Sequence, residues 1–306
     1  MLASRPFPGP AFDQLTDVEF LDGPLPDAIG AVRTDVEALA VVHEVVDNRT
    51  LDLLPNLRVV ANYGVGYDDI DVAACAARGV PVTNTPGVLD AATADLAFAL
   101  VLAARRRVAE GDALIRRGEW PSGIDRFLSA DVSGATIGLV GMGRIARAVA
   151  RRAAAFDMRV LYTKRTRLPV DEERELDVAY RALDDLLAEA DVVSLHVPLD
   201  ESTAGLIDAR RLALLREGAC LVNTSRGSVV NEDALVSALA AGSITAGLDV
   251  FADEPRVPPL LRELPNVVLT PHIGSATRAT REAMTRALVD NLLAADRGEP
   301  LPTPVT

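Results

Sequence analysis

GLVGMGRIA, residues 138–146, is the stretch that decides the fold of this chain. The apolar run Thr136–Val140 predicts a buried strand, and the Ala- and Arg-rich run at 144–156 predicts a helix. Between them, Gly141 permits a tight turn and Gly143 lets the backbone approach a ligand closely. Because the first turn of a helix presents unpaired N–H groups, the stretch predicts a site for the diphosphate of a dinucleotide. The same glycine spacing also occurs in turns that bind nothing, so the flanking strand and helix carry this prediction.

Strands and helices alternate on both sides of this stretch. Strands are predicted at 38–46, 58–61, 80–83, 136–141, 159–163, 191–197, 219–223, 245–250 and 267–270. Helices are predicted at 69–78, 91–118, 144–156, 183–190, 209–215, 232–241 and 277–295, with a loop at 119–134. This order predicts an α/β fold with two doubly wound parallel sheets, one of them a sheet of six strands. We expect a Rossmann dinucleotide-binding domain at 98–282 and a flavodoxin-like substrate domain at 1–97, completed by 283–306.

Composition restricts the possible partners. The 306 residues can form two domains, and the net charge of −13 argues against nucleic acids and anionic membranes. The N-terminus has no apolar core of signal-peptide length, and the apolar stretch 91–104 is interrupted by Asp95 and is too short to cross a bilayer. Cys75 and Cys220 form neither a CxxC nor a metal pattern, so we expect buried free thiols, no metal site and a cytoplasmic location.

The residues after the second strand of the dinucleotide-binding unit predict which cofactor binds. An acidic residue about 20 positions past the glycines marks NAD specificity, because it accepts a hydrogen bond from the ribose 2′-hydroxyl. Here the sequence instead reads Lys164, Arg165, Thr166 and Arg167. A 2′-phosphate would receive charge-assisted hydrogen bonds from these cations, so we expect NADP(H) to be preferred, with NAD(H) possible. The alternative is a solvated basic turn balanced by the acidic run at 171–173.

Three segments in the second half carry residues that suit carbonyl reduction. Arg226 follows a predicted strand that ends at Asn223, Glu254 follows the strand that holds Asp249, and His272 follows the last strand. Because ligands bind at the carboxyl ends of parallel strands, we expect these side chains to converge. Histidine suits the role of proton donor, a carboxylate would orient its ring, and arginine can bind a planar carboxylate at two points. Separately, each has an ordinary structural explanation; together they indicate catalysis.

GVGYDDID, residues 64–71, is a second glycine-containing turn after a strand. Its backbone could face a ligand. By itself, however, the local chemistry favours a plain strand-to-helix turn in which Asp68 or Asp69 caps the helix.

With these motifs in view, the chain resembles the D-isomer-specific 2-hydroxyacid dehydrogenases. The resemblance runs nearly end to end, through NYGVGYDDID, GVPVTNTPGVLDAATADLAFAL, GLVGMGRIA, LVNTSRGSVVNEDAL, GLDVFADEP and TPHIGSAT. Within the family the sequence is most similar to the glyoxylate/hydroxypyruvate reductases and the hydroxyphenylpyruvate reductases, which also carry an Arg-containing basic turn like YTKRTR.

The resemblance implies roles for individual residues. It makes His272 the catalytic acid, Glu254 its partner and Arg226 the substrate-binding arginine, and it implies that Val65, Gly66 and Trp120 contact the substrate. We expect the cofactor to be bound by Thr93; Gly141, Gly143, Arg144 and Ile145; Lys164, Arg165 and Thr166; His196, Val197, Pro198 and Thr203; Thr224 and Ser225; Asp249; and Gly274 and Ser275.

The sequence therefore predicts an NADPH-dependent reductase of small 2-oxoacids such as glyoxylate and hydroxypyruvate, acting as a homodimer by family resemblance. One alternative is a reductase of aromatic 2-oxoacids such as phenylpyruvate or hydroxyphenylpyruvate. Another is a dinucleotide-sensing scaffold like the C-terminal-binding-protein corepressors, although the basic turn disfavours the NAD that such a scaffold would sense.

Overall fold

The computed structural model describes residues 1–120 and 127–305, so part of the loop expected at 119–134 lies outside the described residues. The chain divides into two compact units, Met1–Leu89 with Ser275–Thr306 and Asp90–Gly274. Both boundaries fall eight residues before those expected from the sequence, at Leu89 instead of 97 and at Gly274 instead of 282. The second unit is called the dinucleotide unit below, and the first is called the terminal unit.

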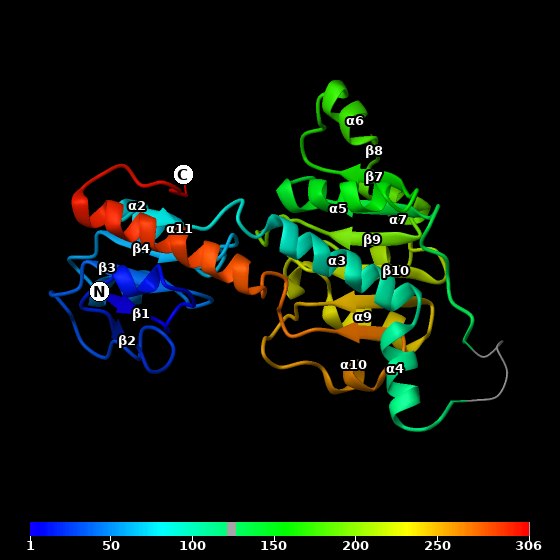
Figure 1. Cartoon of the computed structure of the whole chain (residues 1–306), viewed down its shortest axis with the longest axis horizontal. Coiled ribbons are helices and arrows are strands. Elements are labelled where there is room, and N and C mark those ends of the chain that lie inside the picture. Colours follow the sequence, from blue (N-terminus) through cyan, green and yellow to red (C-terminus); the bar gives the residue numbers. More distant parts are fainter. Residues whose placement is uncertain (121–126, 306) are drawn as a thin grey trace. The chain divides into compact units, whose positions relative to one another are not determined.

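The dinucleotide unit contains a seven-stranded parallel sheet (Figure 1). Its strands are β6 (Thr136–Val140), β7 (Arg159–Thr163), β8 (Val178–Tyr180), β9 (Val192–Leu195), β10 (Ala219–Asn223), β11 (Ile244–Leu248) and β12 (Val267–Leu269). They lie in the order β12-β11-β10-β9-β6-β7-β8. The strand order reverses between β6 and β9, which is the Rossmann arrangement and the point at which a dinucleotide binds.

Helices cover both faces of this sheet. They are α3 (Asp90–Arg105), α4 (Val108–Arg116), α5 (Arg144–Ala154), α6 (Val170–Leu176), α7 (Leu183–Glu189), α8 (Ala209–Leu212), α9 (Glu232–Ala240) and α10 (Pro259–Glu263). Because strand side chains alternate, Ile137 and Leu139 pack with α3 and α5, while Val140 packs with α7 and its neighbours. Apolar residues on both faces explain why these strands read as continuous hydrophobic runs.

The terminal unit contains five parallel strands in the order β2-β1-β3-β4-β5. These are β1 (Leu2–Ala3), β2 (Glu19–Phe20), β3 (Ala38–Val41), β4 (Val59–Asn62) and β5 (Val82–Thr83), with α1 (Asn48–Leu53), α2 (Val72–Ala77) and α11 (Arg278–Arg297). This is the flavodoxin-like strand order. The C-terminal helix α11 packs against β4, so the end of the chain completes the unit that the N-terminus begins.

Two sequence predictions about the dinucleotide unit were wrong. The helix predicted at 91–118 is two helices, because Arg107 adopts a left-handed conformation with φ of 53° between α3 and α4. Arg105 is nearly buried and donates to the carbonyls of Asp131 and Asp191, while Arg107 is bound to Glu110. Arginine is a good helix former, so residue propensity does not predict the break. The sheet has seven strands instead of six, because the three-residue β8 is too short to show a period.

Both cysteines are buried and free, as predicted. Burial raises the pKa of both thiols, to about 11 for Cys220. In the described part of the chain, none of the helices combines the length and the apolar composition that a membrane span requires.

Candidate active site at the carboxyl ends of the strands

The glycine loop connects β6 to α5. Gly141 has φ of 93°, and a Cβ there would lie 2.5 Å from the carbonyl oxygen of His196, so only glycine fits. Its N–H donates to the Thr163 carbonyl at 3.0 Å, which ties the loop to the end of β7.

The start of α5 has room for a phosphate. Gly143 is the N-cap residue, and a Cβ built on it meets nothing within 4 Å. The helical hydrogen bonds begin with Arg147 N–H donating to the Gly143 carbonyl, so the N–H groups of Arg144 and Ile145 have no acceptor within the helix. Open space in front of these N–H groups fits the diphosphate of a dinucleotide.

The segment after β9 forms the other side of this loop. His196 donates its backbone N–H to Val140, and its Nε2 lies 2.9 Å from the Ser194 hydroxyl. Burial lowers the pKa of His196 to about 4, so the ring is neutral at physiological pH. Val197 lies beside Gly141, and the Thr203 hydroxyl donates to the Pro198 carbonyl at 2.6 Å, which closes the turn that follows.

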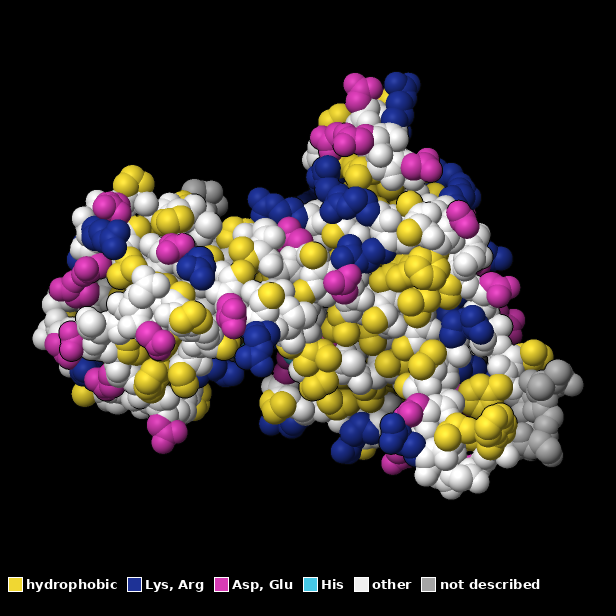
Figure 2. Space-filling view, viewed as in Figure 1, with side chains coloured by type: hydrophobic (Ala, Val, Ile, Leu, Met, Phe, Trp, Pro, Cys, Tyr) yellow, Lys and Arg dark blue, Asp and Glu magenta, His cyan; other side chains and the backbone are white. Residues whose placement is uncertain are grey.

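The basic turn after β7 consists of Lys164, Arg165 and Thr166, whose side chains are exposed. The acidic run at 171–173, which could balance these cations, pairs with three arginines, one of which is Arg167. Asp171 pairs with Arg174, Glu172 with Arg147 and Glu173 with Arg167. Of the three cations in YTKRTR, Arg167 is therefore held by Glu173, and Lys164 and Arg165 are the two at the tip of the turn. Figure 2 shows Lys and Arg side chains over α5 and toward α6, mixed with acidic side chains.

Arg226 stands on a turn built by Asn223, the last residue of β10. The buried Asn223 side chain accepts from the N–H and hydroxyl of Ser225 and donates to the Arg226 carbonyl at 2.8 Å. The next residue must be glycine, because a Cβ on Gly227 would lie 1.9 Å from the Phe251 carbonyl carbon. The turns after β10 and β11 therefore touch through their backbones. The buried Thr224 hydroxyl has no hydrogen-bond partner in the described part of the chain.

Asp249 organises the turn after β12. Its side chain is 1% exposed and accepts three hydrogen bonds, from the Thr270 hydroxyl at 2.6 Å and from the N–H groups of Ile273 and Gly274 at 2.8 Å each. Burial raises the pKa of Asp249, while these hydrogen bonds act in the opposite direction. The buried Thr93 of α3 packs against Gly274, and Ser275 then begins the turn into α11.

His272 lies in the middle of this turn. Its backbone N–H donates to the Asp249 carbonyl at 2.9 Å, and it adopts a left-handed conformation with φ of 52°. The ring Nδ1 lies 2.7 Å from Glu254 Oε2, and Glu254 Oε1 accepts from the Phe251 N–H at 3.0 Å. Both side chains are about one-third exposed. Three adjacent strands, β12, β11 and β10, are thus followed by His272, Glu254 and Arg226.

The terminal unit presents Val65 and Gly66 at the carboxyl end of β4. The Asn62 amide donates to the carbonyls of Gly64 and Gly66, and the Asn84 amide donates to that of Val65. The N–H groups of Val65 and Gly66 donate to no group in the described residues, so they can receive an anion. The helix that follows is capped by Asp71, instead of by Asp68 or Asp69.

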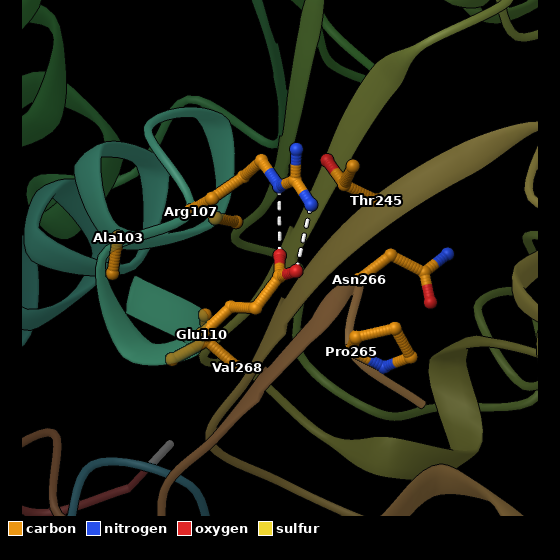
Figure 3. A pocket seen from close by; sticks show the side chains of 8 residues that line it. Ala103, Arg107, Glu110, Thr245, Pro265, Asn266 and Val268 are labelled. Atoms are coloured by element: carbon orange, nitrogen blue, oxygen red, sulfur yellow. Dashed lines mark hydrogen bonds and ion pairs between the residues drawn. The ribbon is translucent and has the colours of Figure 1, made fainter. Parts of the chain in front are cut away.

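Trp120 does not lie at a strand end with Arg226, Glu254 and His272. It follows α4, and its side chain is 81% exposed. A cavity of about 160 Å³ beside the start of α4 is lined by Arg107, Glu110, Thr245 and Asn266 (Figure 3). Thr245 is near the start of β11 and Asn266 precedes β12, so this cavity lies at the amino ends of these strands, whereas His272 follows the carboxyl end of β12.

In the described residues, no cluster of three His, Cys, Asp or Glu side chains could hold a metal ion. The strand-end group combines a histidine paired with a carboxylate and an arginine, residue types that can donate a proton and bind an anion.

Comparison with known proteins identifies the family of the chain. Residues 98–274 match the family described as D-isomer specific 2-hydroxyacid dehydrogenase, NAD binding domain. The chain belongs to the D-isomer specific 2-hydroxyacid dehydrogenases. It is an oxidoreductase with a nicotinamide dinucleotide cofactor, and its family interconverts 2-oxoacids and 2-hydroxy acids.

Relatives cover most of the sequence. The chain is 50% identical over 276 residues to a glyoxylate reductase of Pyrococcus horikoshii, covering 88% of this chain and 82% of that protein. A solved structure from Thermus thermophilus is 46% identical, with a TM-score of 0.91 and coverage of 100% and 99%. An NADPH-dependent glyoxylate/hydroxypyruvate reductase of Sinorhizobium meliloti, solved with NADP and malonate, is 36% identical, with a TM-score of 0.88 and coverage of 100% and 96%.

Sequence reasoning missed the residues that hold the named ones in place. Asn223, Gly227 and Thr270 contact the turns of Arg226 and His272, and none was singled out from the sequence. An Asn at a strand end followed by two hydroxyl residues is a signal for a side chain that bonds the next turn. The close approach at Gly227 has no such local signal.

Proposed function

We propose that this enzyme reduces glyoxylate and hydroxypyruvate with NADPH, giving glycolate and a D-2-hydroxy acid. The observation that carries the proposal is the 2.7 Å contact of His272 Nδ1 with Glu254 Oε2, on a turn fixed by the buried Asp249. The names of the relatives support the choice of substrate.

His272 is the proton donor in this proposal. Glu254 accepts from Nδ1, which fixes the ring and leaves Nε2 as the nitrogen that delivers a proton to the substrate oxygen. The same carboxylate also accepts from the Phe251 N–H, so its own position is set by the backbone. When bound, the reduced dinucleotide supplies the hydride.

Arg226 binds and polarises the substrate. A guanidinium can hold a planar carboxylate at two points and can stabilise charge that develops on the carbonyl oxygen. In the terminal unit, the N–H groups of Val65 and Gly66 are suited to the substrate carboxylate, which is why we assign this unit to substrate and the other to cofactor.

NADPH is the preferred cofactor in the proposal because Lys164 and Arg165 follow β7, where an acidic residue would select NAD. The ion pairs of Asp171, Glu172 and Glu173 with Arg174, Arg147 and Arg167 support this, since these three carboxylates pair with cations other than Lys164 and Arg165.

The test is a panel of 2-oxoacids assayed with NADPH and with NADH. We expect the highest kcat/KM for glyoxylate or hydroxypyruvate with NADPH. Faster reduction of phenylpyruvate or hydroxyphenylpyruvate would replace the proposed substrate class by the aromatic one, and a higher kcat/KM with NADH would refute the cofactor choice.

A further inference from the structure

A buried tyrosine lies beneath the basic turn. Tyr162, the residue before the end of β7, is fully buried. Its hydroxyl accepts from the Leu168 N–H at 2.9 Å and donates to Glu173 Oε1 at 2.6 Å. Residue 162 and residue 168 are therefore joined, and the stretch between them is closed into a short loop.

Glu173 and Arg167 complete this support. Arg167 Nε and Nη2 donate to the two oxygens of Glu173, each at 2.7 Å, and the guanidinium lies 5.7 Å from the centre of the Tyr180 ring on β8. The Glu173 side chain is only 9% exposed. The hydrogen bonds from Arg167 and Tyr162 lower the pKa of Glu173 to about 2, so the carboxylate is ionised at any working pH.

The loop is also bound to the glycine loop at the carboxyl end of the sheet. The carbonyl of Thr163, the last residue of β7, accepts from the Gly141 N–H of the glycine loop. Lys164 and Arg165 come next and are exposed, whereas Leu168 is buried. Both ends of the loop are held, and its cationic tip is presented outward.

We propose that Tyr162, Glu173 and Arg167 are positioning residues for cofactor choice: they hold the loop so that Lys164 and Arg165 meet the 2′-phosphate of NADPH. This rests on the proposed NADPH preference. In this proposal Arg167, although it is a third cation in the motif, acts through the loop, because its Nε and Nη2 are held by Glu173.

Glu173→Gln separates positioning from simple electrostatics, because the two predict opposite signs. Removing a negative charge near a phosphate site, and releasing Arg167, would tighten NADPH binding if charge alone mattered. If Glu173 positions the loop, NADPH binding weakens. We expect the KM for NADPH to rise about ten-fold, with kcat and the KM for NADH unchanged, since a misplaced charge-assisted contact is worth about that factor.

Glu189→Gln is the matched control. Glu189 accepts from Arg159 and Arg181, so it is also a carboxylate shared by arginine near β7, and Arg159 begins that strand. The control should leave both KM values as in the wild type. Tyr162→Phe, which removes only the hydroxyl, is the second test variant and should shift the KM for NADPH in the same direction as Glu173→Gln.

Binding of 2′,5′-ADP and of 5′-AMP, measured by calorimetry, tests the NADPH preference and the positioning role separately. Equal affinity of the wild type for both would refute the NADPH preference itself. A wild type that prefers 2′,5′-ADP, with Glu173→Gln and Tyr162→Phe both keeping that preference in full, would refute the positioning role alone. Tighter binding of 2′,5′-ADP to Glu173→Gln would assign Arg167 to the phosphate instead.

Discussion

The catalytic turn, residues 270–274, is named for the proposed proton donor His272, and the loop at 163–168 has the basic turn at its tip. Both are strand-end turns held by one carboxylate, but the two carboxylates have opposite surroundings. Asp249 accepts from one hydroxyl and two backbone N–H groups, all of them neutral, and its pKa is raised by burial. Glu173 accepts from Arg167 and Tyr162, and its pKa is lowered to about 2. Two carboxylates with little exposed surface thus shift in opposite directions.

Burial is the largest cause of the raised pKa of Asp249, whereas the hydrogen bonds from Arg167 and Tyr162 are the largest causes of the lowered pKa of Glu173. In the catalytic turn, neutral donors hold the loop without placing a further cation beside His272 and Arg226. In the basic turn an arginine is suitable, because the ligand expected there is a phosphate.

The largest expected effect is at the catalytic turn. His272→Gln removes the proton donor but keeps a polar side chain of similar size, so we expect kcat to fall about 10²- to 10⁴-fold. NADPH binding, measured by fluorescence titration, should stay within about two-fold of the wild type, since the cofactor is anchored elsewhere. Near-wild-type turnover would contradict the assigned mechanism.

A smaller loss of turnover is expected when Asp249, the carboxylate that holds the turn of His272, is changed. Asp249→Asn replaces one carboxylate oxygen by an NH2 group, which must face the N–H of either Ile273 or Gly274, so the turn should shift. We expect kcat to fall about 100-fold, as displacement of a reacting group by about 1 Å can do. Unfolding by urea should show a loss of about 1–3 kcal/mol for the unsatisfied donors.

Asp191→Asn provides the control for this change. Asp191 accepts from the Thr136 N–H and from Arg216, at the start of the strands instead of at their ends. It should lower stability without changing kcat. Equal kcat in Asp249→Asn and Asp191→Asn would show that the catalytic turn does not depend on its carboxylate.

The basic turn should respond in cofactor choice instead of in turnover. Arg165→Ala removes one of the two exposed cations, and we expect the ratio of kcat/KM for NADPH over NADH to fall about ten-fold. Arg174→Ala is the control, because Arg174 is an exposed cation nearby whose partner is Asp171. An unchanged ratio in Arg165→Ala would contradict a phosphate site at this turn.

The smallest expected effect is in the acid dependence of stability. Because the folded pKa of Glu173 lies below its ordinary value of 4.5, the stability that the wild type gains over Glu173→Gln is complete above about pH 4.5 and is lost as the pH falls toward about 2. For Asp249 the folded pKa lies above 3.8, so the wild type gains stability relative to Asp249→Asn as the pH falls. Urea unfolding at several pH values measures the stability difference between the wild type and each variant. Plotted against pH, this difference should have slopes of opposite sign for Glu173→Gln and Asp249→Asn. Slopes of the same sign would contradict the contrast between the turns.

Much of the fold could be predicted because its elements are locally encoded. The strands β6, β7 and β10 are apolar on both faces, and the glycine loop has a fixed pattern, so their positions follow from the sequence. The break at Arg107 and the strand β8 could not be predicted, since three consecutive arginines favour a helix and a three-residue strand has no period. In the site, His272 and Glu254 could be named from their places at strand ends, and the structure places them 2.7 Å apart.

The sequence by itself determined the α/β class, the glycine loop, the basic turn and the residues that suit carbonyl reduction, because each depends on residue types at short spacing. Only the tertiary structure decided which groups hold these turns. Asp249 reaches a turn more than twenty residues further along the chain, Gly227 lets two strand-end turns touch, and Glu173 pairs with Arg167. Such contacts join residues that are distant in sequence, and no local pattern records which partner a carboxylate or a glycine meets after folding.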